Sequence, residues 1–215
     1  MELADYGVSQ IVYLMNVVRP QGQAYLPEIA AKVISKYQFA KLPSLEDLSK
    51  ESVKFQIGKF NDVQINEFSV YGDGILVNGR CPTEVLEDFM NDVLKFTKEL
   101  GAIPVLPHRN EVHFESNIVV QSKADLGAFI IPKAEALIRG YVEQRVQVPL
   151  LPSGVVLDFE PNPLKVRRKP SRFFIERRYG VKFEDNVFLC IAPLKTKDHI
   201  ELLTELENEA LKSGQ

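Results

Sequence analysis

The stretch from Val53 to Gly101 constrains the fold most, because the spacing of its apolar residues changes once along its length. Apolar and polar residues first alternate in two runs separated by Asn61-Asp62, and Asp73-Gly74 then fits a tight hairpin turn. From Pro82 onward the apolar residues recur about every 3.6 positions, as on one face of a helix. That face comprises Val85, Phe89, Val93, Phe96 and Leu100, and Gly101 fits a left-handed C-cap. We therefore predict a meander of strands that leads into one amphipathic helix.

The rest of the chain follows the same order of strands and helices. Residues 8–18 fit a buried strand or a short helix equally well. Near the C-terminal end, strands at 173–179 and 187–191 precede a helix, with Thr196 expected as its N-cap and Asp198 in its first turn. Short turns between the strands favour antiparallel pairing. We predict an α+β fold, a largely antiparallel sheet covered by about four helices near residues 24–38, 82–100, 123–144 and 197–212.

Two parts of the chain share one plan. Residues 68–100 and 173–211 each give a strand, a turn, a second strand, a short loop with proline and threonine, and a helix. This suggests two similar strand-strand-helix units, and an old duplication is one explanation. A chain of 215 residues fits a single domain over residues 1–215 or two lobes at 1–107 and 108–215.

Composition points to a cytoplasmic protein. The two cysteines, Cys81 and Cys190, give neither a disulfide framework nor a metal-binding spacing. No apolar run approaches the roughly 18 residues of a membrane span. The sequence also begins with acidic residues where a signal peptide would carry basic ones. We expect a cytoplasmic location and no membrane partner.

Basic residues gather in one window of an otherwise acidic chain. Eight of them lie between Lys165 and Lys182, where Glu176 is the single acid, so this window carries +7 and the remaining chain −10. The eight residues, called the basic strip below, are Lys165, Arg167, Arg168, Lys169, Arg172, Arg177, Arg178 and Lys182. Three aromatic residues lie among them: Phe173, Phe174 and Tyr179. Basic residues interleaved with aromatics are typical of surfaces that bind nucleic acid or another polyanion.

Other interpretations of the basic strip stay open. Its arginines could pair with acids of the same chain, such as Asp158, Glu160 or the acidic helix face at 201–209, because the guanidinium group suits bidentate pairing. The chain is acidic overall, which is unusual for a domain that binds duplex DNA, so an acidic protein surface is an alternative partner. If residues 173–177 form a strand, Phe173, Ile175 and Arg177 share one face.

A second cluster of ionisable residues lies around His113. On a strand, Glu111, His113 and Glu115 would point the same way, and such a face could hold a divalent metal or perform acid–base chemistry. A half-exposed strand shows the same alternation without any function. His199 fits a surface or capping residue at the start of the last helix, and Asp73 fits a turn residue.

Motifs of common enzymes are missing from the sequence. It has no G-x-x-x-x-G-K-[ST] phosphate loop, no G-x-G-x-x-G, no G-x-S-x-G and no paired C-x-x-C. We therefore favour a non-catalytic binding or assembly subunit of a larger cytoplasmic complex, with no catalytic residue, cofactor or metal. Its partners would be other protein subunits or nucleic acid, with self-association open. The alternative is a metal-dependent enzyme such as a nuclease that uses scattered carboxylates.

Overall fold

The described residues form one continuous antiparallel sheet. The computed structural model describes residues 1–15, 26–43, 52–101, 111–126, 143–144, 154–158 and 168–213. Its sheet has nine strands in the order β3-β4-β5-β2-β6-β9-β8-β7, with β1 pairing beside β2 along β6. The strands are β1 (Glu2–Tyr6), β2 (Ser9–Leu14), β3 (Ser52–Phe60), β4 (Val63–Tyr71), β5 (Gly74–Gly79), β6 (Val112–Gln121), β7 (Gly154–Leu157), β8 (Phe173–Arg177) and β9 (Val187–Ala192). The predicted α+β class with antiparallel strands is confirmed.

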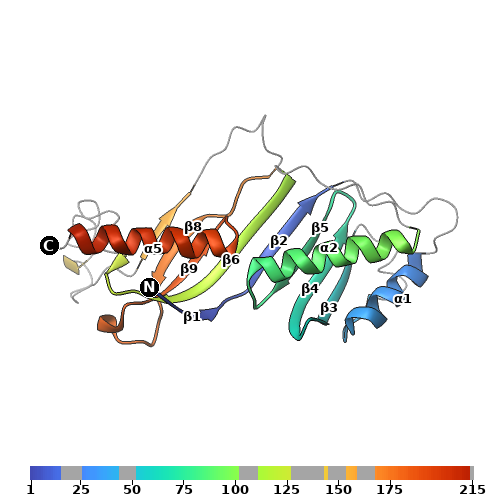
Figure 1. Ribbon diagram of the computed structural model, residues 1–215, viewed down its shortest axis with the longest axis horizontal. Helices are drawn as coiled ribbons and strands as arrows, with labels where there is room; N and C mark the ends of the chain where they lie inside the picture. Colours follow the sequence, from blue (N-terminus) through green and yellow to red (C-terminus); the bar gives the residue numbers. More distant parts are fainter. Residues whose placement is uncertain are drawn as a thin grey trace.

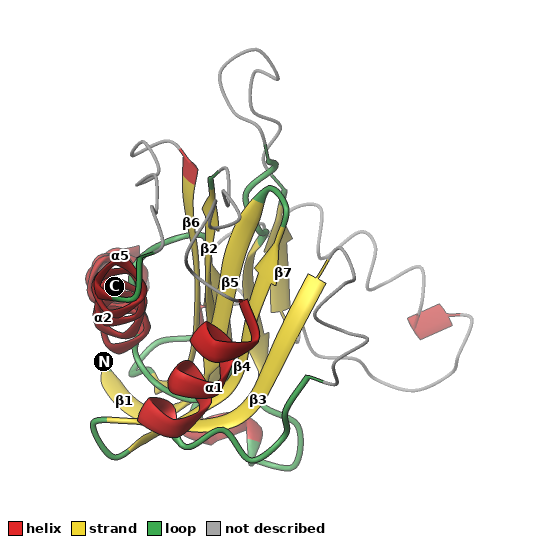
Figure 2. Ribbon diagram, turned by 90° about the vertical axis from the view of Figure 1, so that its right-hand side faces the viewer, coloured by secondary structure: helices red, strands yellow, loops and turns green. Residues whose placement is uncertain are grey.

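Three helices cover one face of this sheet (Figure 2). They are α1 (Leu26–Tyr37), α2 (Thr83–Glu99) and α5 (Thr196–Ser213), and a short 3-10 turn, η3 (Phe183–Asp185), lies between β8 and β9. Helices α2 and α5 lie nearly end to end, with their N-terminal ends facing each other at the middle of the molecule (Figure 1). Within the described ranges, no helix is long and apolar enough to cross a lipid bilayer.

Strand alternation and helix periodicity together build two apolar cores. In the first core, Ile11, Phe68 and Val77 point from the sheet toward Phe89 and Met90 of α2. The second core lies under α5 and is built by Ile118, Val120, Phe173, Ile175, Phe188, Cys190 and Leu203. Of the two alternatives for residues 8–18, the buried strand is correct over Ser9–Leu14, which form β2. The expected turn lies one residue earlier, at Gly72-Asp73, because Tyr71 pairs with Gly74 and Gly74 already begins β5. The positive φ of Gly101 is confirmed.

The sequence underestimates how much of α2 is buried. Leu86, Met90 and Leu94 are buried besides the predicted Phe89 and Val93. The predicted Val85, Phe96 and Leu100 are only partly buried. The physical reason is that α1 packs beside α2, with the Tyr37 ring edge-on to both Phe89 and Phe96, so two sides of α2 meet apolar neighbours.

The strand register repeats in the two halves of the sheet. In the first half, Ser9 pairs with Gly79 and Ile11 with Val77. In the second half, Ser116 pairs with Ala192 and Ile118 with Cys190. The order β3-β4-β5-β2 is thus mirrored by β7-β8-β9-β6, and the two halves join where β2 pairs with β6. The duplication itself stays a prediction.

Some predicted elements need correction or fall outside the described residues. Three helices are described where about four were expected, since most of the helix predicted at 123–144 lies outside the described ranges. The sequence also favours a hairpin between strands at 146–151 and 155–159, joined by Pro152-Ser153-Gly154. The first of these strands lies outside the described residues, and β7, which lies mostly within the second, pairs with β8. Thr196 is the first residue of α5 rather than its N-cap, and its side chain contacts a different helix.

Candidate functional site

The structure divides the basic strip into parts that differ in exposure. Lys165 and Arg167 lie outside the described residues. Five of the other six residues are exposed: Arg168, Lys169, Arg172, Arg178 and Lys182. Arg168, Lys169 and Arg172 lie before β8, whereas Arg178 and Lys182 lie after it. Extended chain advances about 3.3 Å per residue, so Arg172 and Arg178 are roughly 20 Å apart.

At the first end of β8, two cations share one carboxylate. Lys169 Nζ lies 3.1 Å from Asp158 Oδ1, and Arg172 Nε lies 3.6 Å from Asp158 Oδ2. The interpretation that Asp158 pairs with the basic strip is therefore confirmed. All three side chains remain substantially exposed, and exposed pairs of this kind contribute little to stability. These pairs leave the cations within reach of a partner.

Arg177 differs from the other cations because it belongs to the fold. Its side chain is only 10% exposed, and its Nη2 lies 2.6 Å from Asp125 Oδ2. Nη1 donates hydrogen bonds to the Phe183 carbonyl oxygen at 2.7 Å and to Asn186 Oδ1 at 3.1 Å. The guanidinium carbon also lies 3.5 Å from the centre of the Phe183 ring. The alternative that arginines of the basic strip pair with acids of the same chain is therefore correct for Arg177.

These contacts of Arg177 anchor the hairpin that connects β8 to β9. The tip of the hairpin, residues 178–182, projects beyond the sheet, and η3 follows it in orange-brown at the lower left of Figure 1. Tyr179 at the tip is fully exposed, at 101% of its reference area. Gly180 follows with φ of 80°, a conformation that residues with a side chain rarely adopt. Arg178, Val181 and Lys182 are exposed around them.

The cluster around His113 forms no recognisable metal site. His113 and Glu115 do point to the same face of β6, opposite the face that carries Phe114 and the helices, as predicted, whereas the third predicted member, Glu111, precedes the strand. Burial lowers the pKa of His113 below its usual value, and the positive charge of Arg168 lowers it further. Among the described residues, no group of three or more His, Cys, Asp or Glu side chains could hold a metal ion.

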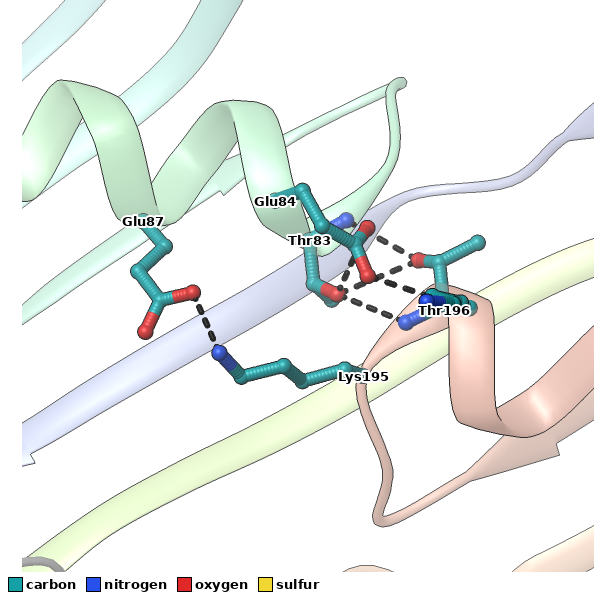
Figure 3. A network of polar contacts seen from close by, with 6 residues as sticks. Thr83, Glu84, Glu87, Lys195 and Thr196 are labelled. Atoms are coloured by element: carbon teal, nitrogen blue, oxygen red, sulfur yellow. Dashed lines mark hydrogen bonds and ion pairs between the residues drawn. The ribbon is translucent and has the colours of Figure 1, made fainter.

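His199 is fully buried, so the expected surface or capping role is wrong. Its Nδ1 lies 3.1 Å from Ser116 Oγ, and Ser116 Oγ donates to Thr196 Oγ1 at 3.1 Å. Thr196 Oγ1 lies 3.2 Å from Thr83 Oγ1, which donates to Glu84 Oε2 at 3.4 Å (Figure 3). A hydroxyl carries one hydrogen, and Ser116 Oγ donates its hydrogen to Thr196. His199 Nδ1 must therefore donate to Ser116 Oγ.

The hydrogen-bonded network of His199, Ser116, Thr196 and Thr83 contains a serine and a histidine at the distance of a catalytic nucleophile and its base, but it resembles such a pair in distance alone. Ser116 and His199 are both completely buried, as is Thr83. Burial lowers the pKa of His199 to about 4, so the ring is neutral near pH 7. A serine and a histidine without access to solvent cannot receive a substrate, and we assign the network to the fold. The sequence held one hint of the buried serine. Ser116-Asn117-Ile118-Val119 is similar to Ser9-Gln10-Ile11-Val12, and in both segments the serine precedes a buried apolar run.

Comparisons with known proteins give no family. No protein-family model matches the chain. No curated protein matches it either. A solved structure described as Methanococcus jannaschii TBP is similar over 99% of this chain and 99% of its own length, at 11% sequence identity and a TM-score of 0.44. A likeness this weak carries no functional argument.

Proposed function

We propose that the protein is a non-catalytic binding subunit of a larger cytoplasmic complex, and that it contacts an anionic partner through the basic strip. The observation that carries the proposal is the exposure of five strip cations, in a chain whose other residues carry net negative charge. Exposed arginine and lysine side chains, including those that share a surface ion pair, can meet a partner's negative charge without first being taken out of a buried site. The partner is a nucleic acid or an acidic protein surface.

Two features of the exposed cations support a contact surface. Lys169 and Arg172 are held close together by Asp158, and the hairpin anchored by Arg177 presents Arg178 and Lys182. Cations fixed at two positions along β8 can recognise an extended anion at lower entropic cost than free side chains can. A globular anion would meet only one of the two groups.

The test is a charge reversal that leaves the fold intact. Arg167, Arg168 and Lys169 are changed together to glutamate, and binding is measured by fluorescence anisotropy with a labelled single-stranded oligonucleotide and with labelled polyglutamate. We expect affinity for at least one probe to fall more than about tenfold, because three attractive contacts become repulsive. The melting temperature should stay nearly unchanged, since Arg168 and Lys169 are exposed.

A matched control separates the strip from net charge. Lys54, Lys59 and Lys98 are exposed lysines of the first half of the chain, and their reversal changes the net charge equally. The control should retain binding within about threefold, because long-range charge effects are screened beyond roughly 10 Å. Equal losses in both variants, binding of neither probe by the wild type, or unfolding of the strip variant would each overturn the proposal.

A further inference from the structure

We infer that the tip of the β8–β9 hairpin is a stacking contact for an unpaired base, and that the anionic partner is therefore single-stranded nucleic acid. This inference rests on the proposed function, because the cations of the basic strip would hold the backbone of the same strand. The observation that carries it is the juxtaposition of a fully exposed aromatic ring, Tyr179, with Arg178 and Lys182 on an anchored turn.

The exposure of Tyr179 is unusual for a side chain of its type. Tyrosine normally buries much of its ring, and here the whole ring faces solvent at a hairpin tip. Val181, two residues along, is also exposed. Neither side chain contributes to the two cores. An aromatic side chain held in water gains free energy when a partner covers its faces, as a base does.

The backbone that carries that ring is anchored on the β8 side of the tip. Arg177 and Tyr179 are separated by one residue, and Arg177 is fixed by Asp125, by the Phe183 carbonyl oxygen and by the Phe183 ring. The Arg178 N–H also donates to the Val187 carbonyl oxygen at 2.9 Å, which continues the ladder between β8 and β9. Because the backbone beside Tyr179 is fixed before binding, only the tyrosine side chain loses conformational entropy when a base stacks on it.

The charges around the tip favour a strand over a compact anion. Arg178 and Lys182 are followed by the exposed acids Glu184 and Asp185, so the hairpin has little net charge of its own. Attraction over distance must come from the cations before β8, roughly 20 Å away. A single strand can cross that distance and offers both phosphates and unpaired bases. A duplex hides its base faces in the stack, so we expect it to bind more weakly.

The experiment uses the absence of tryptophan from this protein. Tyr179→Trp introduces a single indole at the tip, which can be excited apart from the tyrosines, and Leu42→Trp introduces one at an exposed position of the first half, where the native side chain is 55% exposed. Each full-length variant is titrated with an oligothymidylate of about 20 nucleotides, long enough to span both groups of cations, and with a self-complementary DNA duplex of the same length. We expect the oligothymidylate to quench the indole fluorescence of the Tyr179→Trp variant and to leave that of the Leu42→Trp variant unchanged, because stacking quenches an indole.

Substitutions without a fluorophore measure the energetic contribution. Tyr179→Phe keeps the ring and should bind labelled oligothymidylate within about twofold of the wild type. Tyr179→Leu keeps apolar bulk without a π face and should lose roughly tenfold or more, the usual effect of losing one stacked base. Val181→Ala at the same tip is the matched control and should change affinity little. Affinity should also fall as salt rises.

The outcomes separate this inference from the function on which it rests. Oligothymidylate binding that is lost on reversal of Arg167, Arg168 and Lys169, without any quenching of the Tyr179→Trp variant, would overturn the stacking contact and keep the proposed function. Binding of polyglutamate alone would overturn nucleic acid as the partner and leave an acidic protein. Equal affinities of Tyr179→Leu and the wild type would overturn the role of the ring. Binding of neither probe would overturn both.

Discussion

At the scale of single residues, His199 has the most unusual surroundings in the described structure. It lies in the first turn of α5 and is buried with one ring nitrogen near Ser116, and its other nitrogen, Nε2, has no hydrogen-bond partner among the described residues. The Phe173 ring lies edge-on to it, with ring centres 6.3 Å apart. A protonated imidazole would place a positive charge in this apolar site. Burial therefore lowers the pKa of His199 to about 4.

We predict that His199 makes the protein less stable as the pH falls from about 6.5 to 4. In this interval the unfolded chain binds a proton at this residue and the folded protein does not, because the ordinary pKa is 6.5. Above pH 6.5 His199 is neutral in both states and does not lower the free energy of unfolding. By pH 4 its titration should lower that free energy by about 3 kcal/mol. Urea unfolding of the wild type and of His199→Asn across this interval measures it.

The difference between the two pH slopes of the free energy of unfolding isolates His199, because the carboxylates and His113 are present in both the wild type and His199→Asn. The free energy of unfolding of the wild type should fall more steeply with decreasing pH than that of His199→Asn, whatever the offset at pH 7. Parallel pH profiles would show that the ring of His199 is accessible to protons in the folded protein. The variant His113→Asn, at the partly exposed histidine, should change the slope less.

At the scale of elements, two helices meet at their N-terminal ends. The positive ends of their dipoles and their unpaired N–H groups would repel one another without acceptors. Thr83 N–H donates to Thr196 Oγ1 at 2.9 Å, and Thr196 N–H donates to Thr83 Oγ1 at 2.8 Å. Glu84 Oε1 accepts from Lys197 N–H at 3.1 Å, and Lys195 Nζ pairs with Glu87 Oε2 at 2.6 Å (Figure 3). Each helix thus supplies the cap of the other.

We predict that the two threonines are energetically coupled. Thr83→Val and Thr196→Val should each cost about 1–2 kcal/mol, as the loss of a buried cap does. The double variant should depart from additivity by at least about 0.5 kcal/mol, since each substitution removes the partner of the other. Chemical denaturation of the four proteins of the cycle gives the coupling energy.

Two other helical threonines provide the control cycle. Thr97 Oγ1 and Thr204 Oγ1 donate to carbonyl oxygens of their own helices, at 2.9 Å to Val93 and 2.8 Å to Ile200. They lie away from the junction, so Thr97→Val and Thr204→Val should be additive. An additive result for Thr83 and Thr196 as well would mean that the contacts between the two helices contribute no coupling.

At the scale of the whole molecule, two cores share one sheet. Phe89 in the first core is completely buried, with ring centres 4.9 Å from Tyr37 and 5.5 Å from Phe60 and Phe68. The second core lies across the β2–β6 pair. Because this pairing and the helix junction connect the halves, we expect residues 1–215 to unfold as a single unit rather than as lobes.

We predict that Phe89→Ala lowers the stability of both halves. The substitution should cost roughly 3–5 kcal/mol, because it leaves a cavity in an aromatic cluster. Hydrogen exchange then reports the extent of the effect: amide protection in β8 and β9 should fall together with that in β4 and β5. Protection that falls only in β4 and β5 would show two lobes that open independently. A loss below about 1 kcal/mol would contradict the packing of α2.

The sequence determined the local elements of this protein, because these depend on residue spacing alone. The two strands on either side of Asn61-Asp62, a turn that includes Asp73 and the end of α2 before Gly101 were all predictable, since backbone geometry repeats every two residues in strands and about every 3.6 in helices. The sequence also located the basic strip and its neighbour Asp158. It placed Arg177 on one strand face with Phe173 and Ile175, but it did not show that this face is buried, because spacing does not give burial.

Only the tertiary structure decided the roles of individual polar residues. Arg177 stacks within the fold while Arg178 is exposed, and this depends on where Asp125 and Phe183 lie in space. His199 is buried because Ser116, 83 residues earlier, faces it from β6. Thr83 and Thr196 meet across 113 residues. Contacts between such distant positions follow from how the two halves pair through β2 and β6, and no local spacing records that pairing.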